Sequence, residues 1–465
     1  GDPGYLERDL ERYAKETAGS LRNLARERLR RECGVVIRGV PGEKKVEDVP
    51  KSSEAGGDSV REDPGIAGQE WRASAPPAGP MPAMNLPVPA ALRLDNGLQV
   101  YLVEQHGLPV VSANVITLCG SDRNPPDRPG LASFTAAMLD EGTGRRPALQ
   151  VAADADQIGA PLSMGSSMDY SYVTTRTLKK NVDAAFELMA DVLLDPAFAP
   201  EEMERLRHDR LTRILQQKDN PGVLAAKVFF QAVYGLAHPY GHMEIGTEES
   251  NREMTREMLR QFYGDGYGAS SSALVVAGDL TEAELRALAE KYFGTWKAAG
   301  PDSRIPAAPG KTCRRIVIVD KPGAPQTVLR IGHVGVARSH PDYAGIEVMN
   351  TAFGGLVSSR INLNLRETHG YTYGASSAYV FRRGPGPFLI GTSVQTEVTA
   401  PAVSEIFGEI KRMREGILTF EELAKAKDSI ARSLPSLFET TPESASSIGQ
   451  LFVHGLSPDY YHRLP

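Results

Sequence analysis

Apolar and polar residues follow two distinct periods along the chain from residue 88 onward. Residues 92–103 alternate between apolar and polar side chains on both sides of Asp95-Asn-Gly, which is typical of a β-hairpin with a tight turn. Other short apolar runs predict strands, and apolar residues at every third or fourth position predict helices. In this half we expect strands at 110–118, 162–168, 170–178 and 273–277. We expect helices at 149–158, 181–194, 200–217, 222–234, 255–263 and 282–293, and a short one within 130–143.

The second half of the chain repeats this order of elements. Its expected strands lie at 314–319, 327–334, 371–381 and 387–396, and its expected helices at 343–353, 358–368, 400–415, 420–433 and 442–453. Both halves begin with strands, continue with a helix and further strands, and end with several helices, which indicates an internal repeat. We therefore predict two similar α+β domains, at 88–304 and 305–465. We expect the second to lack the helix and strand that would complete it.

The first 87 residues have a different pattern. Residues 5–31 are rich in charge with apolar positions at helical spacing, which predicts one or two amphipathic helices broken near Gly19. A strand is expected at 34–40, so that residues 1–41 form a helix-strand unit. Residues 42–87 consist mainly of Glu, Lys, Ser, Gly, Ala and Pro, and we predict a disordered linker there.

Composition and charge narrow the class of partner. The chain has 465 residues, of which 41% are hydrophobic and 24% charged, as in an ordinary globular protein. A net charge of -6 and a pI near 5.9 argue against nucleic acid or an anionic membrane as the main partner. Cys33, Cys119 and Cys313 lie far apart, which favours free thiols over a disulfide framework or a cysteine metal site.

The expected helix within 130–143 carries small residues where a metal site would need ligands. Inverted zincin peptidases bind zinc through His-x-x-Glu-His on one helix, with the glutamate as general base. The corresponding positions here are Ser133, Ala136 and Ala137. Two methyl groups and a neutral hydroxyl cannot replace two imidazoles and a carboxylate, so we expect no zinc site on this helix.

The residues that flank these positions resemble a known family. Pro129-Gly-Leu-Ala before them, and Met138-Leu with Gly142-Thr after them, resemble the pitrilysin (insulinase-like) metallopeptidases, including the mitochondrial processing peptidases. That family has a further zinc-binding glutamate on a second helix, and counting back from Asp219-Asn-Pro places Arg213 at its position. A cation there repels zinc. The resemblance implies that this chain binds no zinc and that the zinc lies in a complementary half.

The same resemblance sets an expectation for the fold. Each half of such an enzyme consists of tandem α+β domains of the pitrilysin type, similar to LuxS and the processing peptidases, in which helices cover an antiparallel-rich sheet. The resemblance extends from about residue 92 to the end of the chain. More weakly, residues 1–41 resemble the closing unit of a preceding domain of the same type.

A second informative stretch lies at 353–374. Ser358 or Ser359 can cap the start of its helix, and Gly370 can end it in a left-handed conformation. In the active enzymes of the family an arginine and a tyrosine of this domain reach the substrate, and the pattern resembles that pair with Arg366 and Tyr373. A guanidinium can grip a peptide carbonyl, and a phenol can donate a hydrogen bond to the oxyanion.

This assignment leaves alternatives open. Arg366 can instead pair with a nearby carboxylate while Tyr371 and Tyr373 pack, and Tyr371 is the catalytic candidate if the register is shifted. Gly354 and Gly355, with Ser358, resemble the glycine loop by which the partner half of mitochondrial processing peptidase holds substrate. No Lys-Ser/Thr follows at the spacing of a phosphate-binding loop.

Histidines outside these stretches give a weaker signal. His238-Pro-Tyr-Gly-His, with Glu244, has residue types that bind metals. Its Pro and Gly indicate a loop rather than one face of a helix, so we expect a capped, solvent-facing loop and not a metal site.

The pattern as a whole predicts a zinc-less half of a bipartite pitrilysin-type peptidase. Such a chain is not catalytic alone, and its partners are a zinc-bearing half, fused upstream or separate, and an unfolded peptide. The alternative is a non-proteolytic structural or peptide-binding homologue like the core subunits of the bc1 complex. The sequence leaves substrate and compartment open, with the bacterial periplasm as one candidate.

Overall fold

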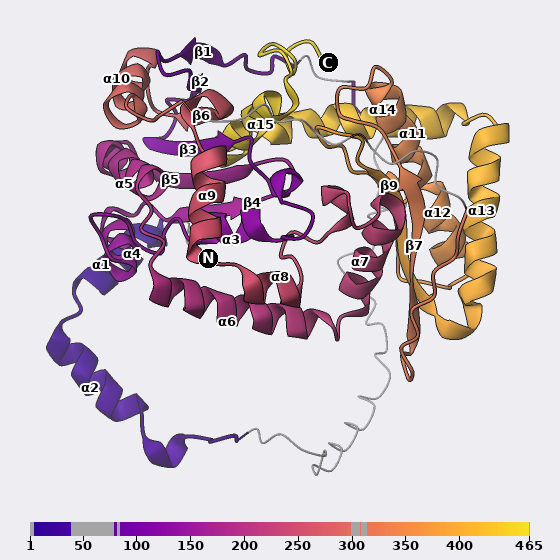
Figure 1. The fold of residues 1–465 in the computed structure, drawn as a ribbon, viewed down its shortest axis with the longest axis horizontal. Coiled ribbons are helices and arrows are strands. Elements are labelled where there is room, and N and C mark those ends of the chain that lie inside the picture. The colour runs from indigo at the N-terminus through magenta and orange to yellow at the C-terminus, as the bar shows by residue number, and fades with distance from the viewer. Residues whose placement is uncertain (1–3, 39–78, 81–83, 299–306, 308–313, 465) are drawn as a thin grey trace, which may run out of the picture. The chain divides into compact units, whose positions relative to one another are not determined.

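The computed structural model describes residues 4–38, 79–80, 84–298, 307 and 314–464 (Figure 1). The chain forms two compact units, residues 1–79 and 80–465. The predicted domains at 88–304 and 305–465 both belong to the second unit.

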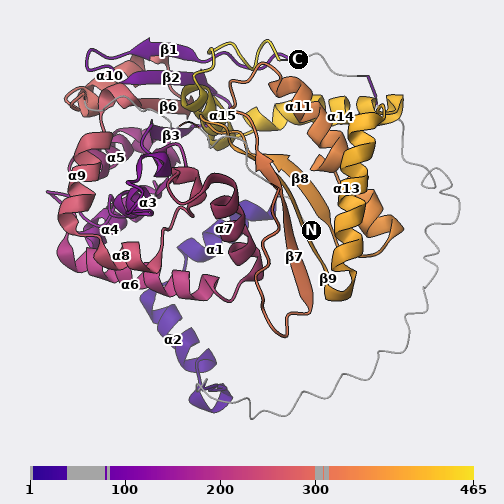
Figure 2. The same ribbon diagram turned by 45° about the vertical axis from the view of Figure 1, so that its right-hand side comes forward.

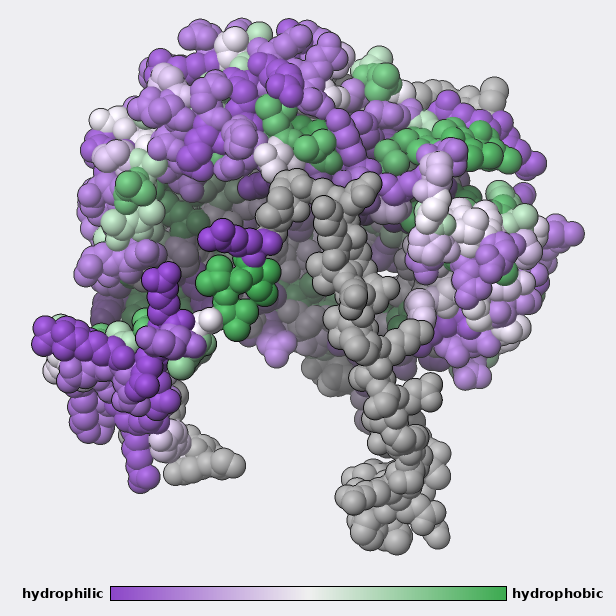
Figure 3. Space-filling model, turned by 90° about the horizontal axis from the view of Figure 1, so that it is seen from below, coloured by the Kyte–Doolittle hydropathy of each residue, from purple (hydrophilic) through white to green (hydrophobic). Residues whose placement is uncertain are grey.

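Within the described ranges, no helix is both long and apolar enough to cross a lipid bilayer. On the face shown in Figure 3, apolar residues form separate groups among hydrophilic ones.

The N-terminal unit contains short helices. α1 (Tyr5–Ala14) and α2 (Ala18–Arg28) are followed by a single 3-10 turn, η1 (Arg31–Cys33). The side chain of Thr17 accepts a hydrogen bond from the backbone N–H of Ser20, and this cap begins α2. Gly19 therefore lies inside α2, and the break predicted near it falls slightly earlier in the chain.

The strand predicted at 34–40 is absent over its described part. Residues 34–38 have no strand partner, and Val35, Val36 and Ile37 are between 83% and 89% exposed. A strand forms only when a neighbouring strand satisfies its backbone groups, so high β-propensity alone was not sufficient. Residues 39–40 lie outside the described residues.

Most of the predicted linker, 42–78 and 81–83, also lies outside the described residues. Its last residues belong to the folded second unit. Leu86 is buried, and the His462 ring donates a hydrogen bond to its carbonyl oxygen over 3.2 Å. The predicted disorder therefore does not extend as far as residue 86.

The second unit contains a first sheet of six strands in the order β1-β2-β6-β3-β5-β4. β2 and β6 are parallel, and all other neighbouring pairs are antiparallel. Its strands are β1 (Ala90–Arg93), β2 (Gln99–Glu104), β3 (Val110–Thr117), β4 (Leu162–Ser166), β5 (Ser171–Leu178) and β6 (Ser272–Gly278). The helices of this half are α3 (Leu131–Ala137), α4 (Ala148–Ile158), α5 (Val182–Leu194), α6 (Pro200–Gln217), α7 (Pro221–Tyr234), α8 (Glu248–Glu253), α9 (Arg256–Gly266) and α10 (Glu282–Phe293).

Helices cover both faces of this sheet. Every residue of β6 is buried, as its almost continuous apolar sequence requires. One face packs against α3, α5, α9 and α10 and forms the main core. The opposite face carries Ile116 and Val275, which pack against Ile448 and Leu451 of α15 (Thr441–His454). Figures 1 and 2 both show α15 alongside β3 and β6, so a helix near the C-terminus completes the first half.

The second sheet has three antiparallel strands in the order β7-β9-β8. They are β7 (Gln326–Val334), β8 (Ala375–Tyr379) and β9 (Pro387–Gln395). Its remaining elements are α11 (Tyr343–Asn350), the π-helical turn η7 (Thr351–Gly355), α12 (Arg360–Asn362), the π-helical segment η8 (Leu363–Thr368), α13 (Thr399–Glu415) and α14 (Phe420–Ser433). One face forms a core with α12, η8 and α13. On the other face α7 packs against β7 through Phe229 and Val334 (Figure 2).

The strand predicted at 314–319 is absent, and the repeat explains why. In the first sheet β6 lies between β2 and β3. In the described part of the second half no strand takes the place of β6, so β7 is an edge strand and residues 314–319 have no neighbour. Ile316 and Ile318 are consequently 88% and 85% exposed.

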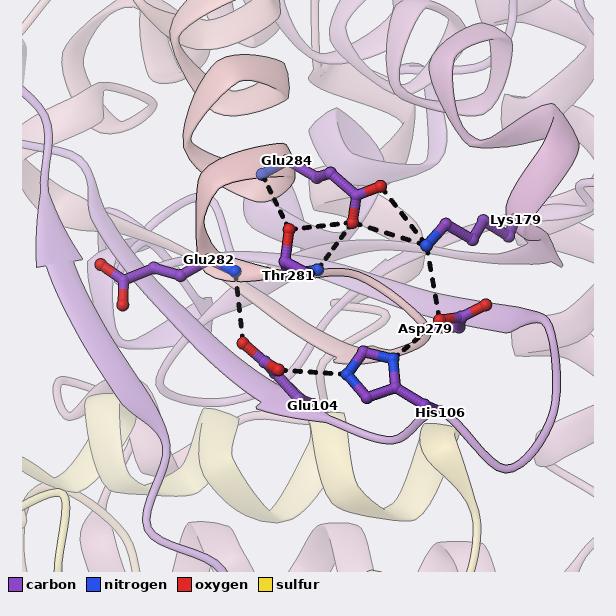
Figure 4. A network of polar contacts seen from close by, with 7 residues as sticks. All are labelled: Glu104, His106, Lys179, Asp279, Thr281, Glu282 and Glu284. Atoms are coloured by element: carbon purple, nitrogen blue, oxygen red, sulfur yellow. Dashed lines mark hydrogen bonds and ion pairs between the residues drawn. The ribbon is translucent and has the colours of Figure 1, made fainter.

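Two polar networks hold loops of the second unit. His106, after β2, lies 2.7 Å from Asp279 and 3.1 Å from Glu104, and Lys179 also contacts Asp279 (Figure 4). The second network is buried and joins the two halves. Tyr240 donates to Asp169 over 2.6 Å, and the backbone N–H of Arg383 donates to the other carboxylate oxygen over 2.8 Å.

Candidate functional site

Helix α3 carries Ser133, Ala136 and Ala137, the residues that the sequence pattern places at zinc-ligand positions. It begins after Gly130, which has a φ of +95° and packs so closely on Ile245 that a Cβ atom would collide with the carbonyl. Ala136 is fully buried, whereas Ser133 and Ala137 are partly exposed. The hydroxyl of Ser133 lies 2.6 Å from the carbonyl oxygen of Glu244, to which it donates. This side chain is therefore used to hold a loop.

Arg210 of α6 lies directly against this position. Its Nη2 donates to the Ser133 hydroxyl over 3.0 Å and to the Gly130 and Ile245 carbonyl oxygens over 3.1 Å and 2.9 Å. Nε donates to Asn251 over 2.7 Å. The guanidinium is thus surrounded by neutral acceptors.

The charge of Arg210 is buried without a carboxylate partner among the described residues. The side chain is 7% exposed, and its guanidinium lies over the Phe134 ring at 4.7 Å. Burial, and to a smaller extent Arg213, lowers the pKa of Arg210 to about 9, which leaves it charged at neutral pH. A fixed cation at this point, together with two alanines and a serine, does not fit a zinc ion.

Sequence spacing pointed to Arg213 and missed Arg210. Arg213 lies on the exposed side of α6, whereas the residue in contact with Ser133 is Arg210, one helical turn earlier. Arg210 lies within one helical turn of the position reached by counting, and no signal in the sequence says which of the two arginines faces α3.

The Arg366 region is partly π-helical. α12 passes into η8, and Gly370 ends the helix with a φ of +65°, which confirms the predicted left-handed end. Ser359 occupies the N-cap position, although its hydroxyl makes no capping hydrogen bond. Arg366 is exposed and lies 3.2 Å from Glu367, and within the described residues no hydrogen bond joins it to Tyr373.

The structure separates the two candidate tyrosines. Tyr371 is half-buried, packs against the core of the second sheet and stacks on His369 at 4.9 Å between ring centroids. Tyr373 is 92% exposed. It borders a cavity of about 360 Å³ on the face of the sheet that also carries α7. The cavity is lined by Gln326, Arg330, Thr372, Tyr373, Gly374, Ser376, Leu389, Gly391, Thr392 and Ser393.

Of the two glycines, Gly354 has a packing role. Gly354 is buried in the π-helical turn, and a Cβ atom there would collide with Ser377 of β8. Close packing of this turn on the sheet therefore explains why position 354 is a glycine, without a contact with substrate. Gly355 is exposed and Ser358 half-exposed, so a contact with substrate stays a prediction for these two.

The histidine loop at 238–242 is not solvent-facing, contrary to expectation. Tyr240 is fully buried, and Nδ1 of His238 accepts its backbone N–H over 3.0 Å. His242 Nε2 donates to the Leu236 carbonyl oxygen over 2.7 Å. The loop is buried because Tyr240 is anchored on Asp169 between the two halves. Across the described ranges no group of three or more His, Cys, Asp or Glu could hold a metal ion.

Comparison with known proteins follows the same division into two halves. Residues 99–244 match the insulinase family model (peptidase family M16), and residues 253–430 match the model of the peptidase M16 inactive domain. The chain belongs to the pitrilysin, or insulinase-like, family of metallopeptidases. The insulinase family model thus coincides with the half that carries Ser133 and Arg210.

Individual members of the pitrilysin family are similar over most of their length. An uncharacterized zinc protease of Rickettsia bellii is 27% identical over 376 residues, which cover 79% of this chain and 89% of that protein. Another from Bacillus subtilis is 25% identical, covering 76% and 86%.

Solved structures agree on the fold. A peptidase M16 inactive domain from Pseudomonas fluorescens superposes with a TM-score of 0.76 at 25% identity, covering 81% of this chain and 91% of that one. A chain of complex III2 from Candida albicans has a TM-score of 0.66 at 14% identity, covering 79% and 86%, and shares the fold. The pitrilysin-type α+β architecture predicted from the sequence is confirmed.

Proposed function

We propose that this pitrilysin-type chain is the zinc-less half of a bipartite peptidase and supplies Tyr373 and Arg366 to a peptide held at a zinc-bearing half. The observation that carries the proposal is the contrast between the two tyrosines. Tyr371 packs in the core, whereas Tyr373 projects at the border of a cavity and has no packing role that would account for it.

The chemistry of these side chains suits substrate binding more than autonomous catalysis. The Tyr373 phenol can donate a hydrogen bond to an oxygen that gains negative charge as a peptide carbonyl is attacked. Arg366 is exposed, and its ion pair with the adjacent Glu367 leaves N–H donors for a substrate carbonyl. Zinc, supplied by the other half, would polarise that carbonyl and activate water. Arg210 and Ser133 argue that this chain does not supply it.

A second candidate function is a non-proteolytic, peptide-holding or structural role. The likeness to a chain of complex III2 favours it at the level of fold. The two functions differ in what they require of Tyr373, because a scaffold does not need an exposed phenol.

The test is to isolate the chain with its natural partner and assay the complex. We expect a zinc-bearing pitrilysin-type half to co-purify and the complex to hydrolyse an unfolded peptide, with neither half active alone. A stable complex that contains zinc but retains full activity in the Tyr373→Phe variant would contradict the role given to this chain. A complex without peptidase activity would favour the scaffold.

A further inference from the structure

The cavity beside Tyr373 contains a charged residue that the sequence did not single out. Arg330 of β7 pairs directly with Gly391 of β9, and Gly391 pairs with Ser376 of β8. Directly paired residues of neighbouring antiparallel strands point to the same face, so these three form a row across the sheet. All three line the cavity.

Gly391 provides the space in which the guanidinium lies. A Cβ atom at this position would be 3.2 Å from Nη1 of Arg330 and 3.5 Å from Cζ. The guanidinium therefore extends over the bare backbone of β9, toward β8 and the segment that carries Tyr373. A larger residue at 391 would displace it.

The charge of Arg330 is not neutralised within the described part of the chain. Nη1 donates to the carbonyl oxygen of the adjacent Leu329 over 3.0 Å, and no described carboxylate forms an ion pair with the guanidinium. Burial alone lowers the pKa of Arg330. The cavity lining includes no Asp or Glu. Beside the guanidinium it contains the hydroxyls of Ser376 and Ser393, which can also donate hydrogen bonds. The site therefore offers several donors and one positive charge.

We infer that Arg330 binds a carboxylate of the peptide that Tyr373 contacts. A guanidinium presents a planar pair of N–H donors that matches a carboxylate. Strands β7 and β8 are separated by two interstrand spacings, or roughly 10 Å, and the guanidinium lies over β9 between them. About three residues of extended peptide are therefore enough to reach from the guanidinium past β8 to Tyr373. The carboxylate is thus an acidic side chain within about three positions of the bond at Tyr373, or the C-terminus of a short peptide. The choice of a peptide as ligand rests on the proposed function.

Direct binding to the full chain tests this inference without requiring catalysis. The probes are short peptides of Gly, Ser, Ala and Leu, labelled with the uncharged dansyl group, that contain one central Glu or one central Gln, both with amidated C-termini. A third peptide has the central Gln and a free C-terminal carboxylate. Fluorescence anisotropy gives the affinity of each, and the comparison separates a side-chain carboxylate from a terminal one.

We expect at least one carboxylate-bearing peptide to bind about tenfold more tightly than the amidated Gln peptide, as for a charge-assisted hydrogen bond. Arg330→Gln should abolish this difference, and Arg330→Lys should retain part of it. Arg286→Gln, on the exposed face of α10, removes the same charge elsewhere and should leave the preference unchanged.

Equal affinity for all peptides, or a preference that survives in Arg330→Gln, would overturn the inference while leaving peptide binding and the proposed function intact. A preference lost equally in Arg286→Gln would assign it to net charge and would also overturn the role of Arg330. Absence of binding by any peptide would overturn the inference, whereas the proposed function is tested separately by the activity of the assembled complex. Thermal unfolding of each variant, monitored by circular dichroism, establishes that the affinities compare folded proteins.

Discussion

Nη2 of Arg210 donates a hydrogen bond to the hydroxyl of Ser133 over 3.0 Å, from a buried position on α6. The sequence pattern predicts that Ser133 stands where the first histidine of His-x-x-Glu-His would bind zinc. Here a cation and a neutral hydroxyl meet there and bind the backbone of the Glu244–Ile245 loop. The guanidinium would oppose a zinc ion beside it.

Arg210 should contribute strongly to stability. Arg210→Met leaves the buried carbonyl oxygens of Gly130 and Ile245 without this donor, and removes the donor to Oδ1 of Asn251. We expect the free energy of unfolding to fall by about 2–4 kcal/mol, measured by urea denaturation. The matched control is the exposed Arg213→Met, which should change it by less than about 0.5 kcal/mol. Equal stability of the two variants would show that the Arg210 contacts are not important for folding.

The isolated chain should hold no stoichiometric zinc. Ser133, Ala136 and Ala137 provide no ligand set, and catalytic zinc sites use three protein ligands. Elemental analysis after dialysis against a weak chelator should find far less than one zinc ion per chain. If one ion per chain were retained and then lost in a His238→Ala, His242→Ala variant, the histidine loop would be a metal site after all.

The buried carboxyl of Asp122 should make stability depend on pH. Burial, then Asp169, raises the pKa of Asp122 from 3.8 to about 7, while Arg383 and Arg123 act in the opposite direction. Between these two values the folded chain keeps a proton that the unfolded chain releases. The free energy of unfolding contributed by this group therefore decreases as pH rises from about 4 to about 7 and then stays constant.

Asp122→Asn tests this effect. Urea denaturation of the wild type and the variant at about pH 5 and about pH 8 should show a smaller pH dependence in the variant. Asp127→Asn, at an exposed position, is the control and should match the wild type. A slope unchanged by Asp122→Asn would mean that other groups cause it.

His106 should titrate above its ordinary pKa. Its hydrogen bond to Asp279, and then the one to Glu104, raises the pKa of the imidazole (Figure 4). The associated stabilisation is fully present below the ordinary pKa of 6.5 and is lost as pH rises through the raised value. An NMR titration of the His106 ring proton should show the shift, and Asp279→Asn should reduce it more than Glu104→Gln. A titration at the ordinary value would indicate that the network is not formed in solution.

Local signals in the sequence identified elements whose partners are close by. Asp95-Asn-Gly predicted the hairpin of β1 and β2, and Gly97 indeed has a φ of +93°. Gly370 likewise ends its helix as predicted. Residues 34–38 and 314–319 have the composition of strands, but a strand depends on a neighbour that composition does not reveal.

In the candidate site, too, the sequence identified local elements but not the tertiary contacts between them. Counting back from Asp219-Asn-Pro correctly located helix α6. Which residue of α6 reaches Ser133 depends on how α6 is rotated about its axis against α3, and in the structure that residue is Arg210, not Arg213. The difference between Tyr371 and Tyr373 also depends on tertiary packing, because only Tyr371 packs against the core of the second sheet. The sequence did not identify Arg330 as a candidate binding residue. An arginine within a strand suggests a binding site only once the structure shows that Gly391 lies opposite it and leaves room for the guanidinium.

The decisive prediction concerns Tyr373 in the assembled peptidase. Tyr373→Phe removes one hydroxyl from an exposed ring, so folding should be unaffected, and kcat should fall about a hundred-fold if the phenol stabilises the oxyanion. Tyr371→Phe removes the equivalent hydroxyl from a tyrosine that packs against the core, and it should lower kcat only slightly. Arg366→Ala should raise KM as well, because a guanidinium that grips a substrate carbonyl also acts before the transition state. Steady-state kinetics on one unfolded peptide compare the three variants. If all three retained full turnover, these side chains would have no part in catalysis, and a scaffold would be the better description of this chain.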